Sequence, residues 1–240
     1  MDTIHIQNKG RALMVAHRGC SGLEKENTMP AFVAAGNRSY FGIETDIHKT
    51  ADGKYIVFHD DTTARVAIDN MVVEETSYDT LRALPLTDKN GNRGRIDLRM
   101  PNLEEYIGVC KYYGKYAVLE LKNAFLEEDI YEICSIIDGL GYLDKTIFIS
   151  FCYDNLVFLR KKYPAQAAQF LISKFPEDLI TRLKTQSLDL DIKYTALDKE
   201  KIELCHKNGI LVNCWTVDNA EKAEELISWG VDYITTNILE

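Results

Sequence analysis

The residues of this chain that could do chemistry lie where short apolar runs end. Glu44 and Asp46 are two positions apart in "IETDIH", so in an extended strand their side chains point to the same face. Glu120 and Lys122 repeat this spacing in "VLELK". Three carboxylates facing one cavity repel each other unless a cation neutralises them, and an all-oxygen ligand set suits Mg²⁺ or Ca²⁺ better than zinc. The sequence therefore favours one divalent cation held by Glu44, Asp46 and Glu120 over a set of salt bridges.

Histidines and cations stand close to the same run ends. His17 and Arg18 follow the run "LMVA", and His59 follows "YIVF". Imidazoles titrate near neutral pH and can carry protons, while a guanidinium fork and the Lys122 ammonium can grip phosphate. A metal, two histidines and two cations suit phosphoryl transfer better than carbonyl or glycosidic chemistry. His48 is left out of the metal set because we expect it to begin a turn.

Eight short apolar runs alternate with amphipathic stretches along the chain. The predicted strands are 12–16, 42–47, 116–121, 146–151, 167–172, 188–192, 210–215 and 233–235, and the predicted helices are 29–37, 102–113, 127–140, 155–163, 177–185, 199–207 and 220–228. This alternation predicts an α/β fold, a (β/α)₈ TIM barrel. An open doubly wound sheet is the alternative, but no GxGxxG motif follows a strand. The barrel would bring the candidate residues together at its mouth, with Trp215 at the end of the seventh predicted strand.

One region interrupts the alternation. About forty residues separate His59-Asp60 from "MPNLEEY", and they include a "KNGNRG" turn and what reads as a pair of short strands. We interpret this region as an insertion in the loop after the second strand, within a single domain spanning residues 1–240. An insertion in a βα loop would lie above the barrel mouth.

The composition of the chain limits the classes of binding partner that are expected. The net charge of -9 argues against nucleic acid and anionic membranes as general partners. No apolar run is long enough to span a bilayer, and no signal peptide is expected at the N-terminus. The six cysteines are scattered without a CxxC pair, which is typical of a reduced cytoplasmic protein. We therefore expect a cytoplasmic enzyme with a small-molecule substrate and no stable membrane insertion.

An ordered series of motifs resembles the glycerophosphodiester phosphodiesterase family, one of the phospholipase-C-like phosphodiesterase TIM barrels. The series comprises "HRG" at 17–19, "ENT" at 26–28, "IETDIHKTADGKYIVFHDD" at 43–61, "MPNLEEY" at 100–106, "LELK" at 119–122, "WTV" at 215–217 and "GVDYITT" at 230–236. The chain departs from the family at "HDDTTARVA", which lacks the usual hydrophobic-then-Arg-Thr-Thr continuation. It departs again at Thr236-Asn237, where Thr-Asp-Pro is common.

The resemblance implies a TIM barrel with a small inserted subdomain over residues 62–99, and it implies roles for the candidate residues. His17 and His59 match the acid/base histidines, Arg18 and Lys122 the phosphate contacts, and Trp215 an aromatic residue of the pocket. The implied metal ligands are Glu44, Asp46 and Glu120. Asn27 and Asp60 match motif positions that we interpret as supportive.

The implied activity is metal-dependent hydrolysis of glycerophosphodiesters, such as glycerophosphocholine or glycerophosphoethanolamine. The products would be sn-glycerol 3-phosphate and an alcohol, and the route would pass through a cyclic phosphate. The alternatives are a lysophospholipase D-type phosphodiesterase on the same fold and a catalytically silent barrel that binds phosphorylated metabolites.

Overall fold

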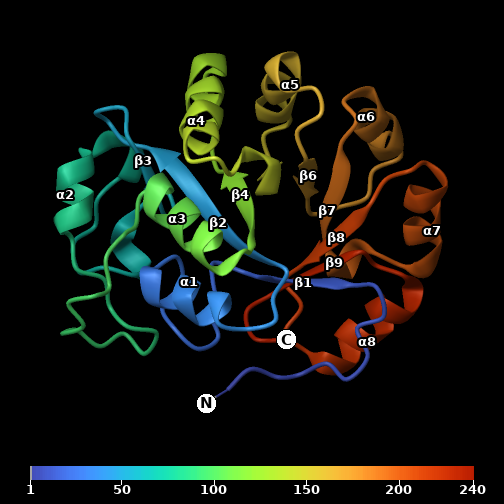
Figure 1. The fold of residues 1–240 in the computed structure, drawn as a ribbon, viewed down its shortest axis with the longest axis horizontal. Coiled ribbons are helices and arrows are strands. Elements are labelled where there is room, and N and C mark those ends of the chain that lie inside the picture. Colours follow the sequence, from blue (N-terminus) through green and yellow to red (C-terminus); the bar gives the residue numbers. More distant parts are fainter. Residues whose placement is uncertain (1) are drawn as a thin grey trace.

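Eight parallel strands close into a barrel in the computed structural model, which describes residues 2–240 (Figure 1). The barrel strands are β1 (Leu13–Ala16), β2 (Gly42–Lys49), β4 (Tyr116–Leu121), β5 (Thr146–Ser150), β6 (Ala168–Ile172), β7 (Asp189–Lys193), β8 (Val212–Trp215) and β9 (Tyr233–Thr236). Their order is β1-β9-β8-β7-β6-β5-β4-β2, and pairing of β1 with β2 closes the ring. The predicted (β/α)₈ barrel is confirmed, and each predicted strand overlaps an observed one.

Helices surround the strands, as Figure 1 shows. They are α1 (Met29–Gly36), α3 (Leu103–Tyr113), α4 (Glu127–Gly139), α5 (Tyr153–Lys162), α6 (Leu179–Thr185), α7 (Lys199–Lys207) and α8 (Ala220–Trp229). Side chains cap the last two at their first turn: Asp198 accepts from the Lys201 N–H at 2.9 Å, and Asn219 accepts from the Lys222 N–H at 2.8 Å. Capping satisfies N–H groups that lack a partner within the helix, so both helices begin close to where the sequence predicts.

The inserted segment packs beside β3 (Tyr55–Val57), which pairs antiparallel with β2. It contains η1 (Thr63–Arg65), η2 (Val73–Glu75) and α2 (Tyr78–Ala83), which lies at the left of Figure 1. Nine buried side chains form an apolar cluster here: Ile56, Phe58, Val66, Val73, Leu81, Leu84, Leu86, Leu98 and Met100. The segment thus contributes most of a second, smaller core next to the barrel.

The predicted pair of short strands in the insertion is wrong. Among the described residues of 62–99, only isolated bridges form, between Thr62 and Val72 and between Ala67 and Leu86. The residues around the "KNGNRG" turn are mostly polar and exposed. They offer no alternating apolar face that could pack a hairpin against the core.

The barrel interior has an apolar layer below its mouth. Val15, Val118, Ile147, Ile149 and Leu171, from four different strands, form one buried cluster. The larger apolar core lies between the strands and the surrounding helices. Within residues 2–240, no helix is both long and apolar enough to cross a lipid bilayer.

Candidate active site

The turn after β1 aims its backbone at the acidic residues. Arg18 has φ 53° and Gly19 has φ 76°, so both adopt the left-handed conformation. A Cβ on Gly19 would lie 2.7 Å from the carbonyl carbon of Ala31, so only glycine fits. The same conformation costs Arg18 roughly 1–2 kcal/mol, and it directs the Arg18 N–H to Glu44 Oε2 at 2.8 Å. Local strain is retained where it positions a candidate ligand.

The three predicted metal ligands come together. Oxygens of Glu44, Asp46 and Glu120 lie within 4.8 Å of one another, and all three side chains are buried. Burial and the charge of Asp46 raise the pKa of Glu44, and they raise that of Glu120 to about 8. Burial acts to raise the pKa of Asp46 as well, but the charges of Arg18 and Lys122 outweigh it and lower that pKa. The cluster has three carboxyl groups but only two neighbouring cations, Arg18 and Lys122, so its negative charge is not fully neutralised.

The oxygens left over in this cluster fit a hard cation. Asp46 Oδ2 accepts from Asn27 Nδ2 at 2.7 Å, and Thr45 Oγ1 fixes that amide by donating to its Oδ1 at 2.7 Å. Asp46 Oδ1 and Glu120 Oε1 are buried without a well-formed hydrogen bond. Lys122 Nζ lies 3.6 Å and 3.0 Å from these two oxygens. An all-oxygen cluster with unfilled acceptors is what Mg²⁺ or Ca²⁺ prefers.

Three hydrogen-bonded side chains from the loops after β1, β8 and β9 orient His17. Asn237 Nδ2 donates to Asp218 Oδ2 at 2.6 Å, and Ser21 Oγ donates to Asn237 Oδ1 at 2.6 Å. The amide oxygen therefore faces His17 Nδ1, 2.7 Å away, and accepts a hydrogen bond from the Nδ1–H. Burial and the charge of Arg18 lower the pKa of His17 to about 4. His17 is thus neutral at pH 7, with Nε2 free to accept a proton.

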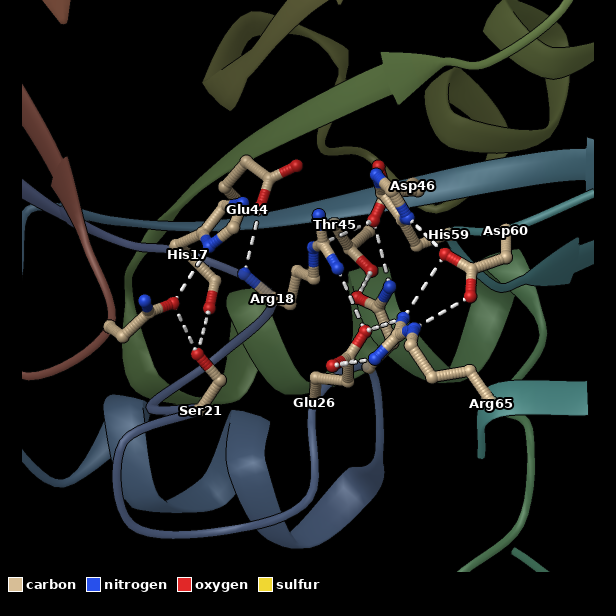
Figure 2. A network of polar contacts seen from close by, with 12 residues as sticks. His17, Arg18, Ser21, Glu26, Glu44, Thr45, Asp46, His59, Asp60 and Arg65 are labelled. Atoms are coloured by element: carbon tan, nitrogen blue, oxygen red, sulfur yellow. Dashed lines mark hydrogen bonds and ion pairs between the residues drawn. The ribbon is translucent and has the colours of Figure 1, made fainter. Parts of the chain in front are cut away.

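A network of charged side chains orients both His59 and Arg18 (Figure 2). His59 Nδ1 lies 2.5 Å from Asp60 Oδ1, and Arg65 Nε donates to Asp60 Oδ2 at 2.7 Å. Two further nitrogens of Arg65 donate to Glu26, each at 2.7 Å, and Glu26 accepts from Arg18 Nη1 at 2.8 Å. Arg65 lies in "HDDTTARVA", the segment that departs from the family pattern. Its role could not be predicted from the sequence, because Glu26 lies 39 residues away along the chain.

His48 does not join the acidic cluster. It lies inside β2, because pairing with β3 extends that strand to Lys49 and replaces the expected turn. The imidazole is buried, with Nδ1 2.9 Å from Glu74 Oε1 and Nε2 3.3 Å from the carbonyl oxygen of His59. His48 therefore helps to fix the backbone of His59 through its contact with that carbonyl oxygen.

One cavity at the barrel mouth is bordered by the acidic cluster and by both histidines. Its lining residues are His17, Arg18, Glu44, His59, Glu120, Ile149, Phe151, Leu171, Asp191, Trp215 and Thr235. The rings of Phe151 and Trp215 meet edge to face at 5.7 Å and form part of its apolar side. The remaining two predicted residues, Asp46 and Lys122, contact Glu120 or Arg18 directly behind the lining. The structure thus gathers all eight predicted site residues at one barrel mouth.

Asp191, in the apolar side of the cavity, was missed by the sequence analysis. It lies in β7, it is 1% exposed, and its Oδ1 has no hydrogen-bond partner. Burial raises the pKa of Asp191 to about 8. The sequence did offer a signal, since Asp191 lies inside the run "LDLDIK" of a predicted strand. An unpaired buried carboxyl group destabilises the fold, so its presence in such a strand indicates a functional role.

The chain matches the model of the glycerophosphoryl diester phosphodiesterase family over residues 17–240. It belongs to this family. The glycerophosphodiester phosphodiesterase of Caldanaerobacter subterraneus is 29% identical over 233 residues, which cover 95% of this chain and 94% of the relative. Another, from Bacillus subtilis, is 27% identical over 254 residues, 97% of this chain and 86% of the relative. An Oleispira antarctica phosphodiesterase, solved with the product sn-glycerol-3-phosphate, has a TM-score of 0.88 at 27% identity, covering 94% of this chain and 92% of that one.

Membership in the glycerophosphoryl diester phosphodiesterase family confirms the predicted enzyme class, a hydrolase of glycerophosphodiesters. The matched residues include both predicted histidines and the whole acidic cluster.

Proposed function

We propose that this enzyme cleaves its diester with one divalent cation held by Glu44, Asp46 and Glu120 and with His17 and His59 as the acid/base pair. The observation that carries the proposal is the buried acidic cluster, which shares one cavity with both imidazoles. Mg²⁺ and Ca²⁺ both suit an all-oxygen site. We further propose a cytoplasmic location and glycerophosphocholine or glycerophosphoethanolamine as the substrate.

Arg18 and Lys122 would bind the phosphate of the substrate. Arg18 lines the cavity, and its Nε is buried without a hydrogen bond, so it has a donor available for a phosphate oxygen. Lys122 Nζ forms an ion pair with Glu120 of the acidic cluster, 3.0 Å from its Oε1. A bound cation would supply charge stabilisation at the phosphoryl oxygens. Trp215 would pack against the carbon skeleton of the substrate, because its ring lies in the apolar wall.

The hydrogen-bond partners suggest how the histidines divide the work. Asn237 accepts from Nδ1 of His17, which leaves Nε2 as the proton acceptor for the substrate hydroxyl beside the esterified carbon. That hydroxyl would attack phosphorus within the same molecule. Burial lowers the pKa of His59, and the carboxylates of Asp46 and Asp60 act against that shift. In its imidazolium form His59 would protonate the departing alcohol. Water would then open the cyclic phosphate with the histidine roles reversed.

The two alternatives gain no support from the structure. A lysophospholipase D would need an apolar groove for an acyl chain. In the insertion Val73 is buried in the second core and Val72 is exposed, but the hollow beside the insertion is lined by charged and polar residues such as Lys25, Arg65 and Asp88. A silent binding barrel would not need two oriented imidazoles beside an acidic cluster.

The decisive experiment is turnover of glycerophosphocholine, followed by ³¹P NMR with and without excess chelator. Chelation should abolish turnover, and Mg²⁺ or Ca²⁺ added back separately should restore it. Glu44→Gln should weaken metal binding, because a neutral amide replaces a charged ligand. Full activity in chelator, with metal shown to be absent, contradicts the metal site.

A second substrate tests the cyclic route. A propane-1,3-diol diester keeps the terminal hydroxyl but lacks the one beside the esterified carbon. This analogue should still bind to the enzyme, but its cleavage should be very slow. Cleavage at the rate of the natural diester points to direct attack by water instead.

A further inference from the structure

Five buried side-chain polar atoms within residues 2–240 have no hydrogen-bond partner, and they fall into two groups. Arg18 Nε, Asp46 Oδ1 and Glu120 Oε1 belong to the acidic cluster, where a cation and a phosphate account for them. Asp191 Oδ1 and Trp215 Nε1 belong instead to the β7–β8 side of the same cavity. Nothing in the proposed chemistry uses this second pair.

These two atoms lie on neighbouring strands. Lys193 pairs in register with Trp215, so Asp191 lies two residues before the β7 partner of that tryptophan. Both side chains line the cavity, among the apolar groups of Leu171 and Ile149. The cavity therefore has an apolar wall that carries one carboxyl group and one indole N–H, both unsatisfied.

The carboxyl group of Asp191 has no protein cation against it. Burial alone accounts for the high pKa of Asp191, without a charge or hydrogen bond from another residue. A neutral carboxyl group both donates and accepts a hydrogen bond, and an indole N–H only donates. A hydroxyl group, which donates once and accepts twice, is complementary to this pair.

We propose that Asp191, assisted by the Trp215 indole N–H, binds the terminal hydroxyl of the substrate's glycerol unit and so selects glycerol over related diols. This inference rests on the proposed function. The glycerol unit is common to all these substrates, so a built, buried subsite suits it better than it suits the variable alcohol. Leu171 and Ile149 provide an apolar surface for the carbon that bears the hydroxyl.

The test combines two substrates with two variants. The substrates are glycerophosphocholine and its propane-1,2-diol analogue, which lacks only the terminal hydroxyl and keeps the attacking one. The wild-type enzyme should favour the glycerol diester in kcat/KM by about tenfold or more, because the analogue leaves buried polar groups unpaired. Asp191→Leu should abolish most of this preference. Asp191→Asn, a neutral group that still donates and accepts, should keep much of it.

The preference is a ratio measured on one enzyme preparation, so it does not depend on the fraction of a variant that folds. Thr235→Val is the matched control. Thr235 lines the same cavity, but its hydroxyl already donates to Asn213 Oδ1 at 3.1 Å. Its removal should change kcat/KM for both substrates alike and leave the ratio intact.

Two outcomes overturn the inference. In the first, Asp191→Leu keeps the wild-type preference, and Asp191 is then a structural residue only. In the second, both Asp191 variants lose a preference for the choline diester over its uncharged 3,3-dimethylbutanol analogue, and Asp191 then binds the cationic alcohol instead. A wild-type enzyme that cleaves neither glycerol nor propane-1,2-diol diesters contradicts the proposed function itself, which separates the two failures.

Discussion

Replacing Asp191 by Asn should change how the stability of the fold depends on pH. Burial raises the pKa of Asp191 from its ordinary 3.8 to about 8, so between these values the folded state holds a proton that the unfolded state has released. The unfolded state binds fewer protons, and the free energy of unfolding therefore falls as pH rises through this window. One proton corresponds to about 1.36 kcal/mol per pH unit. From pH 5 to pH 7 the wild-type protein should thus lose roughly 3 kcal/mol that Asp191→Asn does not lose.

Urea unfolding of both proteins at pH 5 and pH 7, with chelator present throughout, measures this effect. Other groups titrate alike in the two proteins and cancel in the difference, and the chelator removes stabilisation by metal. The free energy of unfolding of the variant, relative to that of wild type, should rise by roughly 3 kcal/mol between pH 5 and pH 7. Asp69→Asn, at an exposed position, is the control and should show no such growth. A constant difference for Asp191→Asn would refute a protonated Asp191 in the folded state at pH 5 and so remove the basis of the argument.

Three further substitutions test the packing and the phosphate contact. In Gly36→Ala the added Cβ would lie 2.4 Å from the Tyr113 ring, and overpacking should lower the Tm in a thermal melt by about 3–10 °C. Gly108→Ala, in a helix with nothing within 4 Å of the added Cβ, should instead raise it by about 1–3 °C; equal shifts would contradict the proposed contact. Arg18→Lys keeps the charge but loses the guanidinium fork that spans Glu26 and the cavity. It should lower kcat/KM by about tenfold or more, and wild-type kinetics would mean that the fork does not hold phosphate.

Much of the fold could be predicted from the sequence because its signals are local. Each barrel strand is a short apolar run, and each helix shows its own periodicity, so both appear within a few neighbouring residues. Helix starts at Asp198 and Asn219 were readable for the same reason, since a capping side chain bonds a backbone group three residues away. The position of the acidic pair in β2 followed from the two-residue period of a strand.

The supporting residues of the site could not be predicted, because their partners are distant in sequence. Asn237 meets His17 across 220 residues, and Arg65 meets Glu26 across 39. Such pairs arise only when closure of the barrel brings β9 beside β1 and the insertion packs beside β3. His48 was wrongly expected to begin a turn for the same reason. It lies in a strand because β2 pairs with β3, and this pairing is not evident from the neighbouring residues.

The sequence by itself determined which residue types stand at the strand ends, and hence that carboxylates, imidazoles and cations would meet at one mouth. Only the tertiary structure decided which of their polar atoms are left without partners. Asp191 shows the difference: its strand is evident in "LDLDIK", but its isolation depends on the residues that neighbouring strands place around it. The cost of a buried carboxyl group is set by its surroundings in space, and these are fixed by sheet closure and register rather than by its neighbours in the chain.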